Sequence, residues 1–136
     1  MIHYITSTCL HLIHLRAHAE VTAMSHADAT RRAIVVELDP RPHDLEAEQG
    51  EVLLVRHEAD PALHIIVVSL AELPLLRLLR RVGEGRLSPN DLQVVVLTLG
   101  EDGFVRAVEI DVDDAGEFTG LWPDGFFDAR HAELFY

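Results

Sequence analysis

The sequence predicts an α/β fold: a small mixed sheet with a βαβ crossover, an antiparallel hairpin at its edge and a C-terminal aromatic plug. Residues 63–68 form a continuous, β-branched apolar run, which is typical of a buried parallel strand. Residues 73–82 place leucines on one side of a helix. Residues 100–103, Gly-Glu-Asp-Gly, separate two further apolar runs at 92–99 and 104–111, which predicts a hairpin.

Two more elements are expected between the N-terminal segment and the predicted strand at residues 63–68. Residues 33–38 are a short apolar run that ends in Asp-Pro, so we expect a strand that stops there. Residues 45–58 are expected to form a helix. Gly50 weakens that helix, and residues 51–56 could form a strand instead.

The N-terminal segment is expected to lie apart from the sheet. Residues 4–19 place apolar side chains on one helical face, so we expect a helix there. The chain then divides into an extension outside the core, residues 1–30, and an α/β domain, residues 31–136. An alternative is that Met24 is the natural start and that the residues before it are an upstream extension.

Composition limits the partners of the chain. A length of 136 residues suits one modest core, and a net charge of −12 argues against gripping a nucleic-acid backbone. The sequence has no apolar run of eighteen residues, so we expect no membrane partner. The single Cys9 excludes an internal disulfide, which fits the cytoplasm. Four arginines are expected to pair with the chain's own carboxylates rather than with phosphate: Arg77, Arg80, Arg81 and Arg86.

The most specific sequence feature lies near the C-terminus. Three of the eight aromatic residues fall within seven positions, around a Pro-Asp-Gly turn. So many rings around one turn indicate a plug that presses into an apolar groove of this chain or of a partner. The plug consists of Trp122, Pro123, Asp124, Gly125, Phe126, Phe127 and Asp128.

This run resembles the W-P-x-G-F-F-D signature of a small C-terminal domain in bacterial ABC-type ATPases of the AAA, SMC-like and RecF-like kinds. Residues 86–92 are similar to the G-x-L-S-P-x-D-V stretch of those proteins, and residues 107–111 resemble their I-x-I-D segment. The resemblance covers residues 62–128 and is fainter over 33–61. It implies that residues 31–136 form a degenerate ATPase head.

The resemblance also shows which catalytic groups the chain has lost. Glu37 takes the magnesium-side acidic position, and Leu70 replaces the switch histidine that contacts the γ-phosphate. Ser69 and Glu72 are the remaining positions of this degenerate nucleotide site. The chain has no lysine, no G-x-x-x-x-G-K-[ST] motif and no ABC signature. Phosphoryl transfer needs charge neutralisation by backbone amides, lysine and Mg²⁺. We therefore expect no catalytic residue, no cofactor and no ATP hydrolysis by the isolated chain.

The function implied by the resemblance is that of a non-catalytic, ATPase-derived interaction or regulatory module. It would be accessory to a bacterial ATPase system of defence or DNA repair. Its protein partner would be a second copy, giving a homo-oligomer, or a P-loop ATPase. The alternative is one component of a split ATP-hydrolysing complex whose P-loop comes from a partner chain. We expect no metal site. The weak candidates for metal ligands are three histidines that would share a helix face and could bind zinc or nickel: His11, His14 and His18.

Overall fold

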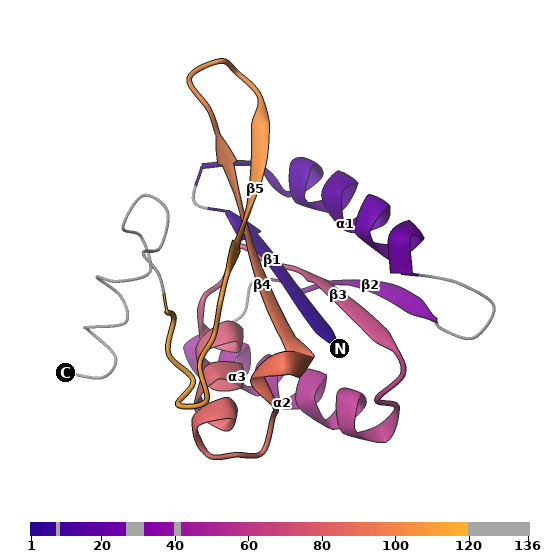
Figure 1. Cartoon of the computed structure of the whole chain (residues 1–136), viewed down its shortest axis with the longest axis vertical. Helices are drawn as coiled ribbons and strands as arrows, with labels where there is room; N and C mark the ends of the chain where they lie inside the picture. Colours follow the sequence, from indigo (N-terminus) through magenta and orange to yellow (C-terminus); the bar gives the residue numbers. More distant parts are fainter. Residues whose placement is uncertain (8, 27–31, 40–41, 120–136) are drawn as a thin grey trace.

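The computed structural model of the chain describes residues 1–7, 9–26, 32–39 and 42–119 (Figure 1). The expected plug at residues 122–128 therefore lies outside the described residues. Within them, the α/β class, the βαβ crossovers and the antiparallel edge hairpin are confirmed. No described helix is both long enough and apolar enough to cross a membrane.

Five strands form one mixed sheet in the order β2-β3-β1-β4-β5. The first four strands of that order are parallel, and β5 runs antiparallel beside β4. The strands are β1 (Ile2–Ser7), β2 (Ala33–Glu37), β3 (His64–Val68), β4 (Leu92–Leu99) and β5 (Val105–Ile110). The helices are α1 (Leu12–His26), α2 (His43–Ala59) and α3 (Leu73–Gly83), and a 3₁₀ turn, Pro89–Asp91, precedes β4.

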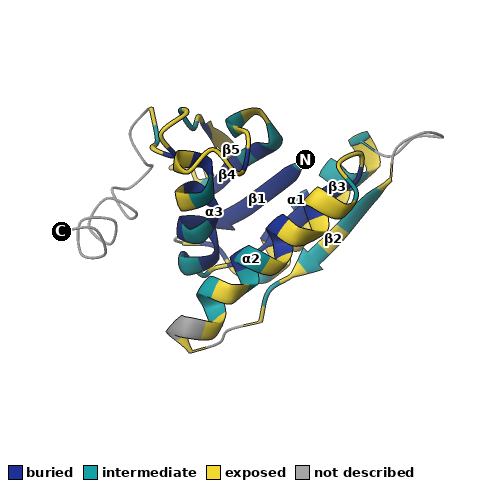
Figure 2. Cartoon of the chain, turned by 90° about the horizontal axis from the view of Figure 1, so that it is seen from below, coloured by how far each residue is buried: buried dark blue, intermediate teal, exposed yellow. Residues whose placement is uncertain are grey.

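The central strand of the sheet is β1, whose six residues are all buried (Figure 2). It pairs with β3 on one side and with β4 on the other, so that Ile2 lies between Ile65 and Leu92. The helix expected over residues 4–19 is therefore wrong for residues 4–7, which belong to β1, and confirmed for residues 12–19, which lie in α1. The N-terminal segment does not lie outside the core. Three of the six residues of β1 are polar, namely His3, Thr6 and Ser7, so the strand shows neither the continuous apolar run nor the strict alternation by which strands are recognised. The alternative start at Met24 would remove this strand.

The remaining predicted elements are confirmed with small changes at their ends. Strands form at 33–37, 64–68, 92–99 and 105–110. Residues 43–59 form the helix α2, so the alternative strand over 51–56 is wrong.

Helices cover both faces of the sheet (Figure 1). On one face, Leu15 and Ala19 of α1 pack against Ile5, Ile66 and Val68. On the other face, α2 and α3 pack together over a larger core. That core includes Leu53, Leu54, Leu75, Leu78 and Leu79 from the helices and Tyr4, Ile65, Val67, Val94 and Val96 from the strands. Two apolar layers thus enclose the sheet, as an α/β fold requires.

Gly50 marks a close approach between α2 and α3. A Cβ atom at this position would lie 2.6 Å from the carbonyl oxygen of Pro74 and 2.9 Å from the Cβ of Arg77. A glycine inside a helix is unfavourable by itself. Here its missing side chain allows the backbones of the two helices to touch.

Next to this contact, Glu51 of α2 binds two arginines of α3. Its Oε1 atom accepts hydrogen bonds from Arg81 at 2.6 Å and from Arg77 at 3.2 Å. Arg86 lies 3.4 Å from the other carboxylate oxygen and also binds Glu58, while Arg80 pairs with Glu84. The expected pairing of these arginines with the chain's own carboxylates is confirmed.

We expect Gly50→Ala to destabilise the fold. Overpacking costs about 1–3 kcal/mol and the better helix propensity of alanine returns about 1 kcal/mol, so the free energy of unfolding should fall by up to about 2 kcal/mol. Urea denaturation measures this change. Glu48→Ala, at an exposed position of the same helix, is the control and should change stability by less than about 0.5 kcal/mol. A stabilised Gly50→Ala protein would contradict the tight helix contact.

We expect Glu51→Gln to lower stability at neutral pH and to have little effect in acid. Burial opposes the charge of Glu51, but hydrogen bonds from Arg81 and Arg77 outweigh it and hold its pKa below the usual 4.5. The ionised carboxylate therefore stabilises the folded state above about pH 4.5, and this contribution is lost as the pH falls through the lowered pKa. Urea midpoints of wild type and variant, measured from pH 7 to pH 3, should converge. A constant gap would show that charge pairing is not the cause.

Candidate functional site

The expected nucleotide-site positions lie at the carboxyl ends of two neighbouring parallel strands. Glu37 is the last residue of β2 and pairs in register with Val68, the last residue of β3. Ser69 follows directly, so the structure brings Glu37 and Ser69 to the same edge of the sheet. In open α/β sheets this is the edge at which ligands bind.

The carboxylate of Glu37 is already occupied by an arginine. Arg16 of α1 donates from Nε to one oxygen at 2.7 Å and from Nη2 to the other at 2.6 Å. The hydrogen bonds from Arg16 lower the pKa of Glu37. A Mg²⁺ ion would have to displace this two-pronged contact, so Glu37 is held as an ion-pair partner and not as an open metal ligand.

The loop after β3 is also bound to its own chain. The hydroxyl of Ser69 accepts a hydrogen bond from the N–H of Ala71 at 3.0 Å, and Tyr4 donates its phenol hydrogen to the carbonyl oxygen of Ala71 at 2.7 Å. Leu70, at the switch position, is 43% exposed and offers no polar group. Glu72 is buried next to the start of α3. These residues stand at the expected edge and show no arrangement that would sense a phosphate.

Two amide hydrogens of the turn from β1 to α1 are bound within the chain. Ser7 accepts hydrogen bonds from the N–H groups of Cys9, at 3.3 Å, and Leu10, at 3.1 Å, and donates to the carbonyl oxygen of Leu97 at 2.7 Å. A phosphate cradle needs free amides at such a strand-to-helix turn. Sequence reasoning missed this turn because it assigned the segment to a helix.

The outer edge of β2 is a second candidate surface. At its two ends, the carbonyl of Arg32 accepts from His64 at 2.8 Å, and the N–H of Leu38 donates to Val68 at 3.0 Å. Because backbone direction alternates along a strand, the N–H and C=O groups of Ala33, Val35 and Glu37 point away from β3. Among the described residues, no strand pairs with this side of β2.

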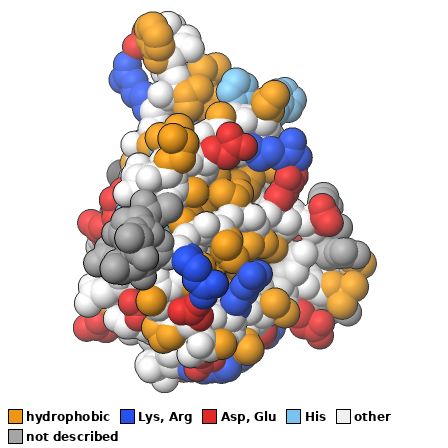
Figure 3. Space-filling model, turned by 90° about the vertical axis from the view of Figure 1, so that its right-hand side faces the viewer, with side chains coloured by type: hydrophobic (Ala, Val, Ile, Leu, Met, Phe, Trp, Pro, Cys, Tyr) orange, Lys and Arg blue, Asp and Glu red, His pale blue; other side chains and the backbone are white. Residues whose placement is uncertain are grey.

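An apolar groove of about 400 Å³ runs between β2 and α2. Figure 3 faces this side of the molecule and shows hydrophobic side chains across its middle, with arginine and acidic side chains around them. The groove is lined by Val36, Leu38, Leu45, Glu48, Gln49, Val52, Leu53 and Arg56. Val52 is 66% exposed and Leu45 is 43% exposed, although both are large apolar residues.

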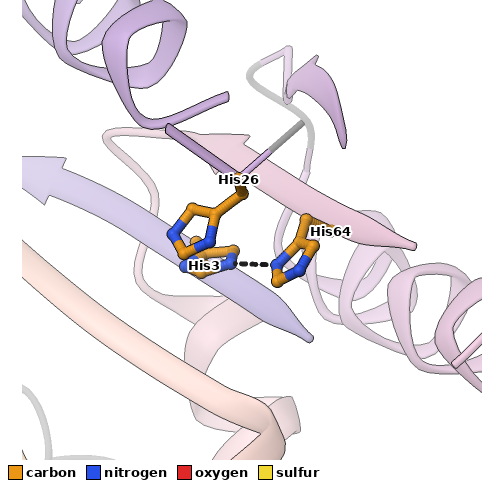
Figure 4. A group of neighbouring side chains, drawn as sticks. All are labelled: His3, His26 and His64. Carbon is orange, nitrogen blue, oxygen red and sulfur yellow. Dashed lines mark hydrogen bonds between the residues drawn. The ribbon is translucent and has the colours of Figure 1, made fainter. Parts of the chain in front are cut away.

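Three histidines meet at the opposite, amino-terminal end of the strands (Figure 4). His3 comes from β1, His64 is the first residue of β3, and His26 is the last residue of α1. One ring nitrogen from each lies within 4.8 Å of the other two. His3 and His64 are buried, and Nε2 of His3 is 2.9 Å from Nδ1 of His64.

The protonation of His3 follows from its neighbours. Its Nδ1 atom lies 2.5 Å from the side-chain oxygen of Gln93 on β4. Because an amide oxygen only accepts, Nδ1 of His3 carries the hydrogen and Nε2 carries a lone pair. Burial lowers the pKa of His3 to about 4, and the charges of His26 and His64 act in the same direction. The ring is therefore neutral at physiological pH.

A pocket of about 280 Å³ opens beside these histidines, between α1 and the β4–β5 hairpin. Thr22, Ser25 and His26 line it from the helix, and Gln93 and Glu109 line it from the strands. Of the metal candidates named from the sequence, His18 also lines this pocket, whereas His11 and His14 are exposed. The histidines that meet in the structure are thus a different set from the one named from the sequence. They lie far apart in the sequence, and no regular spacing relates them.

Comparison with known proteins adds no family to these observations. No protein-family model, no curated protein and no solved structure matches the chain.

Proposed function

We propose that this chain is a non-catalytic interaction module that pairs with a second copy of itself through the outer edge of β2. The observation that carries the proposal is the outer edge of that strand, with which no strand pairs in the part of the chain that the structure describes. Natural sheets usually protect an edge with lysine, proline or a β-bulge. The sequence of β2, Ala-Ile-Val-Val-Glu, contains no lysine and no proline, and its one charged residue, Glu37, is paired with Arg16.

Charge and apolar surface both favour a second copy as the partner. The one acidic residue of β2, Glu37, is paired with Arg16 on its own chain, so two such edges would not repel each other there. The groove between β2 and α2 lies beside the free edge and leaves Leu45 and Val52 exposed. Antiparallel pairing of two β2 strands around a twofold axis would extend the sheet and bring the two grooves together.

The non-catalytic part of the proposal is supported by polar groups at the carboxyl edge of the sheet that already bind other groups of the same chain. Glu37 holds Arg16, and Ser7 holds the amides of the first strand-to-helix turn. Both would have to give up these contacts before they could serve a nucleotide. The sequence resemblance adds to this proposal that the module is accessory to a bacterial ATPase system. The alternative partner at the outer edge of β2 is a P-loop ATPase.

A substitution at Val35 tests the edge. Its N–H points outward, so Val35→Pro removes an edge donor without removing a hydrogen bond to β3, and edge strands tolerate such a proline. Light scattering of the wild-type chain at tens of micromolar should give twice the mass of one chain, and Val35→Pro should give the mass of one. Since each copy carries a charge of −12, added salt should tighten the wild-type dimer.

Val35→Thr is the matched control, because it keeps both the branched side chain and the N–H group, and it should remain dimeric. Far-UV circular dichroism confirms that the proline variant is folded. A wild-type monomer would overturn the proposal. If that monomer also bound a purified P-loop ATPase, and Val35→Pro did not, the edge would belong to the ATPase.

The second candidate is the split ATP-hydrolysing complex. Its supporting observation is that Glu37 and Ser69 lie at the same edge of adjacent parallel strands. In such a complex the partner would have to draw Arg16 away from Glu37. The wild-type chain, mixed with a P-loop ATPase encoded by a neighbouring gene, should then release phosphate from ATP. The same mixture made with Glu37→Gln should not. An unchanged rate would eliminate this candidate.

A further inference from the structure

We propose that His3, His26 and His64 form a binding site for a divalent metal ion of the zinc class, with one coordination position open to the pocket beside α1. The site lies at the amino ends of β1 and β3. It is independent of the β2 edge and of the expected nucleotide positions at the carboxyl ends of the strands.

The geometry requires only small side-chain movements. Tetrahedral zinc binds imidazole nitrogen at about 2.0–2.1 Å, so two ligand nitrogens lie about 3.3 Å apart. The three imidazole nitrogens are already within 4.8 Å of one another, and those of His3 and His64 are 2.9 Å apart. His3 and His64 stand on neighbouring strands of a rigid sheet, which fixes two of the three ligands before the ion arrives.

The hydrogen bond to Gln93 prepares His3 as a ligand. It places the hydrogen on Nδ1 and aims the lone pair of Nε2 at His64. Metal-binding histidines commonly have such an acceptor behind the ring, because it fixes both the tautomer and the orientation. Without a metal, Nδ1 of His64 must donate to Nε2 of His3. Metal binding moves that hydrogen to the other nitrogen of His64 and needs no change of net charge.

The donor set indicates the class of ion. Three neutral imidazoles suit zinc, cobalt and nickel, whereas magnesium and calcium prefer oxygen ligands. Three protein ligands with an open fourth position are typical of zinc sites that hold a water molecule. Here that position faces a pocket of about 280 Å³ to which Glu109 and Ser25 contribute polar groups. A zinc-bound water in this pocket could be exchanged for a small anionic or carbonyl-containing ligand.

Calorimetric titration of the metal-free, untagged full chain with Zn²⁺ tests the site. We expect one ion per chain and tetrahedral Co²⁺ absorption bands when cobalt replaces zinc. His26→Ala, in which a half-buried ring is removed, should weaken Zn²⁺ binding at least about tenfold, and Gln93→Ala should weaken it about 10–100-fold. His14→Ala removes an exposed ring outside the site and should bind as wild type does.

Two measurements keep the test decisive if a buried variant fails to fold. The imidazole NMR signals of His3 and His64 in the wild-type chain should shift on addition of one equivalent of Zn²⁺. The Val35→Pro monomer should still bind one Zn²⁺, so that loss of the dimer and loss of the metal are separate results. Absence of Zn²⁺ binding by the wild type, or equal affinity in folded His26→Ala, would overturn the proposal.

Discussion

The hydrogen bonding of β1 along both of its edges is the constraint on which the rest of this structure depends. With β3 on one side and β4 on the other, all six residues of β1 are buried, so the strand cannot shift its register without exposing apolar side chains. Its register places His3 at the amino end of the sheet and Ser7 at the carboxyl end. The same strand therefore supplies His3 to the histidine cluster and, through Ser7, binds the amides of Cys9 and Leu10 in the turn that follows it.

The sequence was sufficient for the elements whose patterns are local. The unalternating run at 64–68, the leucine face of α3 and the Gly-Glu-Asp-Gly hairpin each carry their own signal, and each is confirmed. β1 could not be recognised in this way, because three of its six residues are polar and it shows neither a continuous apolar run nor strict alternation. The histidine cluster was missed for a related reason. Its members are brought together by strand order and not by spacing, so only the placement of β1 beside β3 reveals them.

At the carboxyl edge of the sheet, several polar groups are bound to one another within the chain. In an open α/β sheet, free amides and carboxylates at this edge attract phosphate and metal ions. Here the amides of Cys9 and Leu10 bind Ser7, the carboxylate of Glu37 binds Arg16, and the amide of Ala71 binds Ser69. Each contact is modest by itself, but a ligand would have to break several of them at once.

Electrostatics favours a cation at the other end of the sheet. His26 is the last residue of α1, where the carbonyl ends of the helix carry partial negative charge. The chain as a whole carries a charge of −12, which raises the local concentration of cations. Imidazole rings bind a metal ion through a nitrogen lone pair and in that form carry no charge, so they do not cancel this attraction. A metal ion would therefore bind at the amino end of the strands, where the three histidines supply the ligands.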